Sequence, residues 1–389
     1  TRTGNWWPRK PKTDCRRGRP VSLSPLLRRV GFDDVPGWDA DDSRAAFAAY
    51  RRSAKKAATR TYRTGSLGIE AAAFAPAHAA ACAAPPDDVG AARTFFETHF
   101  AAFRVVPDDR ARGFVTGYYE PEVDAAPRAS PAFRYPLLSR PDDLVAVDDA
   151  NRPPGLDPYF AFARHYPDGR IGEYFDRAAI EAGALSGRGL EIAWLADPVD
   201  VFFIHVQGAA RLRMPDGAVK RVTYAAKSGH RFTGPGGILA EIGELARENV
   251  TMQTIRAWFC ENPQRKSEIL WQNRSFIFFK EAPVDDPALG PVAAAKVPLT
   301  PGRSIAVDRL LHTFGTPVYV HAPDLAAFGA APFSRLMIAQ DTGSAITGSA
   351  RGDLFAGSGA AAGDIAGVIR HEADFFVLVP RVLADGAGG

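Results

Sequence analysis

Three aspartates in the last quarter of the chain carry residue types and spacing suited to acid–base chemistry. Asp341 follows an apolar run, residues 336–338, and opens the turn Thr342-Gly343-Ser344. A buried strand that ends in an acid can hold the carboxyl half out of water, which raises its pKa and keeps a proton available near neutral pH. The pattern predicts a general acid at Asp341. The residues alone also allow an aspartate that only caps its own turn.

Asp308 and Asp353 have similar surroundings. Asp308 ends the strand-like run 304–307, and Asp353 lies in Arg351-Gly352-Asp353-Leu354-Phe355. We expect the two carboxyls to raise the pKa of Asp341 by like charge, to hold loops, or to stabilise positive charge that develops in a reaction. For Asp353, a purely local bond to backbone is an equally open interpretation.

Two N-terminal helices are expected to support these acids. Asp41-Asp42-Ser43 is typical of a helix start, and apolar residues continue at helical spacing to Ala54. A second helix is predicted after Asp87-Asp88, with a phenylalanine face that belongs to the core. Its members are Phe95, Phe96, Phe100 and Phe103.

Residues 122–232 are rich in Pro, Gly and short strand patterns. Pro215-Asp216-Gly217 joins the runs 209–214 and 218–224 into a predicted hairpin. The apolar run before Gln207 is expected to be another strand, helices return at 238–245 and 251–260, and strands dominate from Ser304. These patterns predict a β-barrel domain, 122–232, inserted into a first domain formed by 21–121 and 233–389.

The three aspartate segments together resemble the 3D domain, a small double-psi β-barrel with three aspartates in this order. Five further segments occur in order, namely 117–122, 202–208, 252–258, 273–279 and 297–304. Through them, over roughly residues 30–380, the chain resembles the membrane-bound lytic murein transglycosylase A (MltA) family. The resemblance implies a mainly β fold with flanking helices, in which a second β-barrel interrupts the double-psi β-barrel and a substrate cleft runs between them.

The family's chemistry needs one carboxyl group, where most glycosidases need two. The C6 hydroxyl of N-acetylmuramic acid attacks its own anomeric carbon. One acid protonates the glycosidic oxygen and then accepts the proton from O6. The resemblance assigns this double role to Asp341, with Asp308 and Asp353 as the other catalytic members. It implies a 1,6-anhydromuramoyl product and no cofactor.

The resemblance also implies a set of substrate contacts. One of Tyr118 and Tyr119 should face the cleft, because neighbours on a strand point to opposite sides. Glu120 and Gln207 suit sugar hydroxyl and N-acetyl groups, and Arg303 suits either a muramic acid carboxylate or an ion pair with Asp308. The predicted substrate-binding residues are Thr116, Tyr118, Tyr119, Glu120, Gln207, Gly208, Arg303, Thr342, Gly343 and Ser344.

Three segments depart from the family pattern. Ala209-Ala210 follows Gly208 where the family has Ser-Gly, Thr347 stands where Lys is common, and 227–232 replaces a Gly-x-Pro-Tyr segment. These changes leave the acid in place and affect the expected subsites.

Composition describes an ordinary globular protein with a basic start. The 389 residues are 46% hydrophobic with a net charge of +3, and residues 1–20 hold seven Lys/Arg against one Asp. We expect this tail to be disordered. No apolar run is long enough to span a bilayer, no signal peptide is recognisable, and Cys15 lacks a lipoprotein context. Cys82 and Cys260 are expected to be buried thiols, and no Cys/His spacing indicates a metal site.

The resemblance implies peptidoglycan glycan strands as the partner, with no nucleic acid. It further implies a monomer in the periplasm or at the periphery of the outer membrane of a Gram-negative bacterium. Two alternatives remain. Asp341-Thr342-Gly343 also matches an aspartic protease, but that mechanism needs two such aspartates and the chain has one. A polysaccharide-binding module without turnover is the second.

Overall fold

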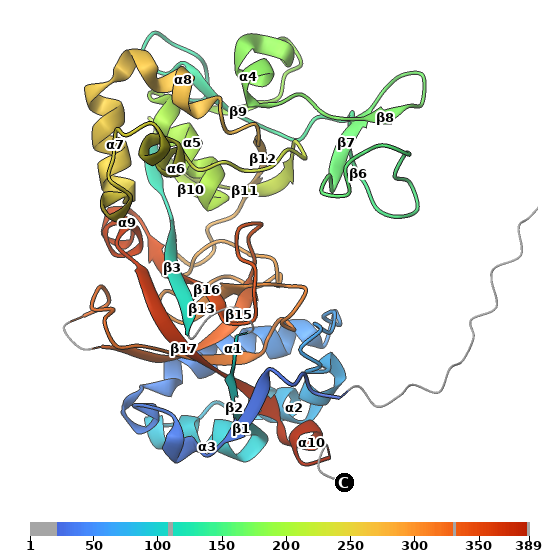
Figure 1. The fold of residues 1–389 in the computed structure, drawn as a ribbon, viewed down its shortest axis with the longest axis vertical. Coiled ribbons are helices and arrows are strands. Elements are labelled where there is room, and N and C mark those ends of the chain that lie inside the picture. Colours follow the sequence, from blue (N-terminus) through green and yellow to red (C-terminus); the bar gives the residue numbers. More distant parts are fainter. Residues whose placement is uncertain (1–21, 108–111, 330–331, 387–389) are drawn as a thin grey trace, which may run out of the picture.

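The computed structural model describes residues 22–107, 112–329 and 332–386, and these form two bodies stacked along the long axis (Figure 1). The predicted basic tail, with Cys15, lies outside these ranges. The chain passes from the lower body to the upper one along β3 (Gly113–Glu120), and it returns through the segment that follows β12 (Ile277–Ala282). None of the helices in the described ranges has the length and apolar character needed to cross a bilayer.

The lower body is a closed six-stranded barrel with two added strands. The sheet order is β1-β2-β17-β14-β15-β13-β16-β3, and a further pairing of β17 with β3 closes the ring. Most pairs are antiparallel, but β13 pairs with β15, and β16 with β3, in parallel. The strands not yet bounded are β1 (Leu27–Val30), β2 (Phe100–Val105), β13 (Ser304–Val307), β14 (Pro317–Ala322), β15 (Phe333–Asp341), β16 (Arg351–Ser358) and β17 (Arg370–Pro380).

Helices cover the lower barrel and share its core. The predicted start of α1 is confirmed, because the Asp42 side chain accepts a hydrogen bond from the N–H of Arg44. The second helix is shorter than predicted: it ends at His99, and Phe100 and Phe103 belong to β2. The helices are α1 (Ser43–Ala57), α2 (Ala75–Ala83), α3 (Val89–His99), α9 (Ala360–Gly367) and α10 (Arg381–Ala384), with 3-10 turns at Phe32–Asp34, Trp38–Ala40 and Ala71–Phe74.

The upper body is a second barrel. Sheet β12-β11-β10-β4 and sheet β5-β9 are joined into a ring by bridges between Ala126 and Trp194 and between Ser139 and Phe279. The predicted hairpin is confirmed as β10 (Ala209–Arg213) and β11 (Val219–Lys227). A three-stranded arm, β6-β7-β8, projects to one side (Figure 1). The remaining strands are β4 (Glu122–Asp124), β5 (Tyr135–Leu138), β6 (Leu144–Ala146), β7 (Phe162–His165), β8 (Ile171–Gly172) and β9 (Glu191–Leu195).

A helical layer belongs to this upper body, which corrects two predictions. The run before Gln207 is not a strand but helix α5, and its Val201 and Ile204 fill the upper barrel. Helices α6 to α8 pack on α5, and β12 pairs with β11, so the upper body continues to Ala282 instead of ending at residue 232. The helices are α4 (Arg177–Ala179), α5 (Pro198–Gln207), α6 (Pro235–Glu241), α7 (Met252–Glu261) and α8 (Lys266–Leu270), with a π turn at Ile180–Ala184 and 3-10 turns at Arg247–Asn249 and Pro263–Arg265.

The prediction of buried cysteines is wrong. Cys82 and Cys260 are free and exposed. In α7 the buried stripe is formed by Ile255, Trp258 and Phe259, and the next residue along the helix is rotated by roughly 100° away from it.

Candidate active site

The lower barrel brings Asp341 and Asp353 to opposite sides of one strand. Ala306 on β13 is the register partner of Asp341 on β15 and also of Asp353 on β16. Two strand spacings separate the acids, roughly 10 Å between backbones. A register shift between Ile305 and Ala306 lies beside Asp341, and irregular pairing of this kind re-aims side chains near active sites.

Asp341 is half-buried and held from two directions. Its Oδ2 accepts a hydrogen bond from the Tyr118 hydroxyl at 3.1 Å, and its Oδ1 accepts one from the backbone N–H of Ala294 at 3.2 Å. Burial raises the pKa of Asp341 to about 6, and the Asp353 charge adds to the rise, while the hydrogen bonds from Thr342, Ala294 and Tyr118 oppose it. The carboxyl can therefore gain and lose a proton near neutral pH, as predicted from its position at the end of a strand.

Asp353 is tied to β3. Thr116, its register partner, donates to Asp353 Oδ1 at 2.6 Å and accepts from the Arg351 guanidinium at 2.7 Å. Burial raises the pKa of Asp353, against the lowering effects of the Thr116 hydrogen bond and the Arg351 charge. Asp353 is thus held by the Thr116 side chain, which the Arg351 guanidinium holds in turn, and not by the purely local backbone bond that the sequence alone also allows.

Asp308 holds loops. Its Oδ1 accepts the N–H of Leu310 at 2.9 Å, and its Oδ2 accepts the N–H of Gly348 at 3.0 Å. Gly348 has φ +113 and belongs to the loop that leaves Asp341. One carboxylate thus joins the end of β13 to the loop after β15, which is among the roles expected for it.

The two tyrosines point to opposite sides of β3, as alternation requires. Tyr118 reaches Asp341, and burial raises the pKa of its phenol well above the usual range. Tyr119 is packed against Ala362 and Ala366 of α9 and is 7% exposed. Tyr118 is therefore the tyrosine that contacts Asp341.

Two predicted substrate contacts are engaged inside the protein instead. Glu120 is fully buried and forms ion pairs with Arg211 at 2.9 Å and Arg221 at 2.6 Å. Arg303 pairs with Asp41 at 2.7 Å, not with Asp308, and is itself buried. Because the Glu120 side chain has no exposed surface and both of its oxygens accept hydrogen bonds from arginines, it is poorly placed to bind a sugar hydroxyl.

The other predicted contacts are spread around the site. Gln207 Oε1 accepts the N–H of Tyr119 at 3.1 Å, and Gly208 ends α5 with φ +77. Gly343 and Ser344 are exposed in the loop after the half-buried Thr342. Ala294 and Arg351 were not predicted. Ala294 acts through its backbone N–H, so its residue type does not reveal the contact in the sequence. Arg351 belongs to the Arg-Gly-Asp motif that contains Asp353.

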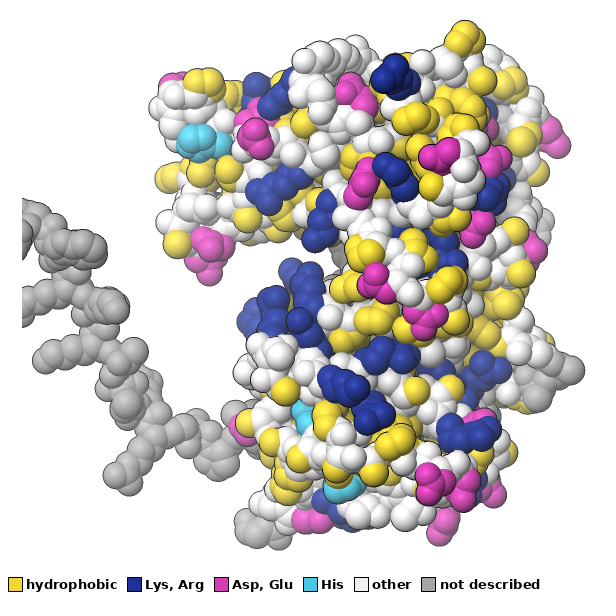
Figure 2. Space-filling model, turned by 180° about the vertical axis from the view of Figure 1, so that it is seen from behind, with side chains coloured by type: hydrophobic (Ala, Val, Ile, Leu, Met, Phe, Trp, Pro, Cys, Tyr) yellow, Lys and Arg dark blue, Asp and Glu magenta, His cyan; other side chains and the backbone are white. Residues whose placement is uncertain are grey.

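The molecule is hollowed between its two bodies. The space-filling view shows a deep notch on one side, with the upper body overhanging the lower one (Figure 2). Both connections between the bodies contribute to the site, since β3 supplies Thr116 and Tyr118, and the segment after β12 supplies Ala294. Among the described residues, no group of three or more His, Cys, Asp or Glu side chains is arranged to hold a metal ion.

Known proteins match both bodies. Residues 114–280 match the MltA specific insert domain, and residues 303–379 match the 3D domain. The crystal structure of a membrane-bound lytic murein transglycosylase from Agrobacterium tumefaciens is 49% identical, with a TM-score of 0.87 over 93% of this chain and 99% of that one. The chain belongs to the MltA family. MltA from Neisseria gonorrhoeae is 30% identical, with a TM-score of 0.74 over 93% of this chain and 97% of that one.

Curated MltA proteins extend the family assignment. The Escherichia coli K12 protein is 32% identical over 279 residues, which is 70% of this chain and 66% of the relative. The Vibrio cholerae protein is 30% identical over 270 residues, so the chain spans 64% of that relative's length. An E. coli MltA crystal structure with bound chitohexaose is 27% identical, with a TM-score of 0.64, over 93% of this chain and 95% of that one.

Proposed function

We propose that this MltA-family protein is a lytic transglycosylase of peptidoglycan. It cleaves the β-1,4 bond between N-acetylmuramic acid and N-acetylglucosamine and leaves a 1,6-anhydromuramoyl end. The observation that carries the proposal is the Asp341 carboxyl at the end of β15, whose pKa of about 6 suits both donating and accepting a proton near neutrality.

Asp341 begins the reaction in its protonated form. It gives its proton to the glycosidic oxygen as the bond to the anomeric carbon breaks. The resulting carboxylate takes the proton from the C6 hydroxyl, whose oxygen attacks the same carbon. Because the nucleophile is already attached to the substrate, the step gains an effective molarity on the order of 10⁵ M or more. No water is consumed, and the acid returns to its starting state.

The other two acids have contacts that suit supporting roles. Asp308 has one backbone N–H on each oxygen, and Asp353 is bonded to Thr116. We assign Asp353 the task of raising the pKa of Asp341, and Asp308 the task of holding the loop that follows it.

The substrate is a glycan strand lying in the notch between the bodies. A strand of this kind, N-acetylated and β-1,4-linked, has the same linkage chemistry as the chitohexaose bound by the E. coli relative. Thr116, Tyr118, Gln207, Gly208, Thr342, Gly343 and Ser344 remain the proposed contacts. We infer that the protein works as a monomer in the periplasm or at the periphery of the outer membrane, without a cofactor.

Mass spectrometry of the products tests the proposal. Purified sacculi are incubated with the protein and with the Asp341→Asn variant, and the released muropeptides are weighed. We expect products lighter than hydrolytic ones by one water, about 18 Da, and their loss in the variant. Hydrolytic ends would point to a second, water-activating carboxylate.

Binding to sacculi without release of muropeptides would distinguish a polysaccharide-binding module from a transglycosylase. If neither protein releases product while both sediment with sacculi, turnover is absent and the fold serves to bind glycan. A pepstatin-type inhibitor with a peptide substrate tests the protease alternative in the same preparation.

A further inference from the structure

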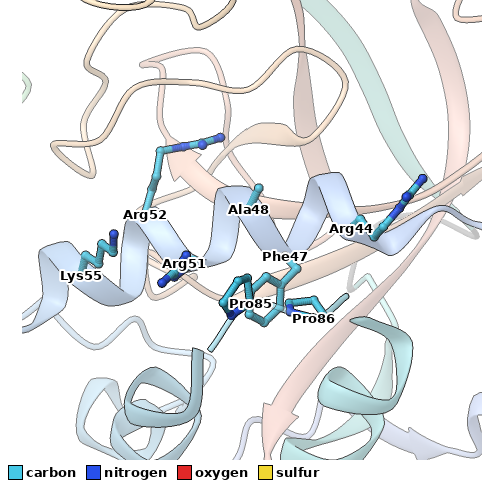
Figure 3. A pocket seen from close by; sticks show the side chains of 8 residues that line it. All are labelled: Arg44, Phe47, Ala48, Arg51, Arg52, Lys55, Pro85 and Pro86. Carbon is cyan, nitrogen blue, oxygen red and sulfur yellow. The ribbon is translucent and has the colours of Figure 1, made fainter. Parts of the chain in front are cut away.

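A basic hollow lies on α1, outside the proposed active site. Its volume is about 270 Å³, and four cationic side chains are spread along the helix above an apolar side made by Phe47 and two prolines (Figure 3). The lining residues are Arg44, Phe47, Ala48, Arg51, Arg52, Lys55, Pro85 and Pro86. None of them is acidic.

The charged residues of α1 and the segment that follows it are all basic. Residues 43–69 contain seven Lys/Arg and no Asp/Glu. Arg51 and Lys55, one turn apart, repel each other, whereas the position of Lys55 in the last turn of α1 is favourable for a cation. Among the described residues, Arg44 pairs with Asp42, whereas no ion pair involves Arg51, Arg52 or Lys55.

Three acids act on the cations of the hollow without lining it. Asp42, Asp88 and Asp286 act electrostatically on Arg44 or Arg52, but none of the three lines the hollow. Arg51 and Arg52 are half-buried; the Arg51 guanidinium donates to the carbonyl of Cys82 and the Arg52 guanidinium to the hydroxyl of Thr300, both neutral acceptors. Among the described residues, Arg51, Arg52 and Lys55 of the hollow therefore have no carboxylate paired with them.

The opposite side of α1 contacts the strand that carries the acid. Gln340, the neighbour of Asp341, donates from Nε2 to the carbonyl of Ala49 and to the hydroxyl of Ser53, both at 2.8 Å. The hollow is thus about one helix diameter, roughly 10–12 Å, from that strand. Arg52 also donates to Thr300, in the segment that supplies Ala294 to Asp341.

We propose that the α1 hollow is an exosite for the carboxylates of peptidoglycan stem peptides. The inference rests on the proposed function and narrows its substrate to peptide-bearing glycan. Guanidinium and ammonium groups bind carboxylates by charge-assisted hydrogen bonds. The hollow lies about one helix diameter from β15, so stem peptides that project from a bound glycan, or from a neighbouring glycan, can extend to it.

An anionic membrane is the less suitable occupant. The surface is concave, and the apolar residues of α1, Phe47 and Tyr50, are buried in the core. A helix that lies on a bilayer instead exposes an apolar face next to its cations.

Binding measurements in the inactive Asp341→Asn background test the exosite. Arg51→Gln with Lys55→Gln removes two cations without touching Arg52 and its bond to Thr300. We expect binding to intact sacculi to weaken about three- to tenfold, with a shallower salt dependence, and binding to amidase-stripped glycan to stay unchanged. Arg28→Gln with Arg370→Gln, two exposed cations of the same body, is the matched control.

The outcomes are distinct. Unchanged binding to intact sacculi, or an equal loss on stripped glycan or in the control variant, would overturn the exosite. So would a loss of binding to phosphatidylglycerol vesicles in place of sacculi, which would indicate a membrane surface. If the protein with Asp341 intact yields no anhydro products while the peptide-dependent binding persists, the proposed function fails and the carboxylate site stands.

Discussion

Burial is the main reason that the Asp341 carboxyl keeps its proton, and burial has a cost that pH can reveal. The native pKa of about 6 lies above the ordinary aspartate value of 3.8, so the native state binds the proton more tightly than the unfolded chain. Stability from this group is fully present below the unfolded value and is lost as pH rises through 6. Activity that needs the protonated acid should fall over the upper part of the same range.

Asp341→Asn should therefore be inactive and yet more stable at pH 8. The amide removes a charge that burial disfavours, a gain of at most about 3 kcal/mol from the size of the shift. Urea unfolding of both proteins between pH 4 and pH 8 measures it, and the gain should shrink toward pH 4. A variant that is less stable at pH 8 would show that the carboxylate is better solvated than its surroundings indicate.

Two neighbours should shift the pH–rate profile in opposite directions. Tyr118→Phe removes a hydrogen bond that lowers the pKa of Asp341, so the alkaline limb should move up. Asp353→Asn removes a like charge that raises this pKa, so the limb should move down. Profiles of kcat/KM for the three proteins test the signs. Complete loss of activity in Asp353→Asn at every pH would instead place Asp353 in the chemistry.

At the scale of single residues, sequence reasoning located the acids and misjudged several of their neighbours. Asp341 could be found because an apolar run before a Gly-Ser turn predicts both the strand and its end. Arg303 and Glu120 could not be assigned, since their partners Asp41, Arg211 and Arg221 are distant in the chain. Ala294 contributes only a backbone N–H, which every residue but proline has.

At the scale of elements, the turn after β15 depends on Asp308. Removing both of its acceptors in Asp308→Ala should free the N–H of Gly348 and loosen the loop, lowering kcat severalfold while the midpoint of the pH profile stays in place. Asp308→Asn keeps one acceptor oxygen and should recover part of the rate. A moved midpoint would mean that Asp308 acts on Asp341 by charge.

Elements with clear local signals were predicted well, and those set by tertiary contacts were not. Asp42 capping α1 and the Gly217 turn between β10 and β11 are local. The apolar run of α5 suits a buried strand as well as a buried helix, and periodicity cannot separate the two over so short a stretch. Its Asp197 cap, with Pro198 at the first helical position, was the available signal.

At the scale of the whole molecule, the two barrels are joined by a buried ion cluster. Glu120 stands at the end of β3, where the chain leaves the lower body, and its partners Arg211 and Arg221 lie on β10 and β11 of the upper one. Ser358 of the lower barrel donates to the same carboxylate at 2.7 Å. Both arginines also donate to the carbonyl of Leu289 in the returning segment, at 3.1 and 3.0 Å. One carboxylate therefore touches both bodies and, through its arginines, the second connection.

Glu120→Gln should loosen this junction, because it leaves two buried guanidinium groups without a counter-charge. Breaking a buried pair in this way typically costs about 3–5 kcal/mol. Glu122→Gln is the matched control, since Glu122 forms only a partly exposed pair with Arg213 and should cost less than about 1 kcal/mol. Urea unfolding measures the difference, and small-angle scattering should report a wider spread of inter-domain distances for Glu120→Gln. Unchanged stability with a raised KM would return Glu120 to the substrate-binding role first predicted for it, because a side chain that only contacts substrate contributes little to holding the two barrels together.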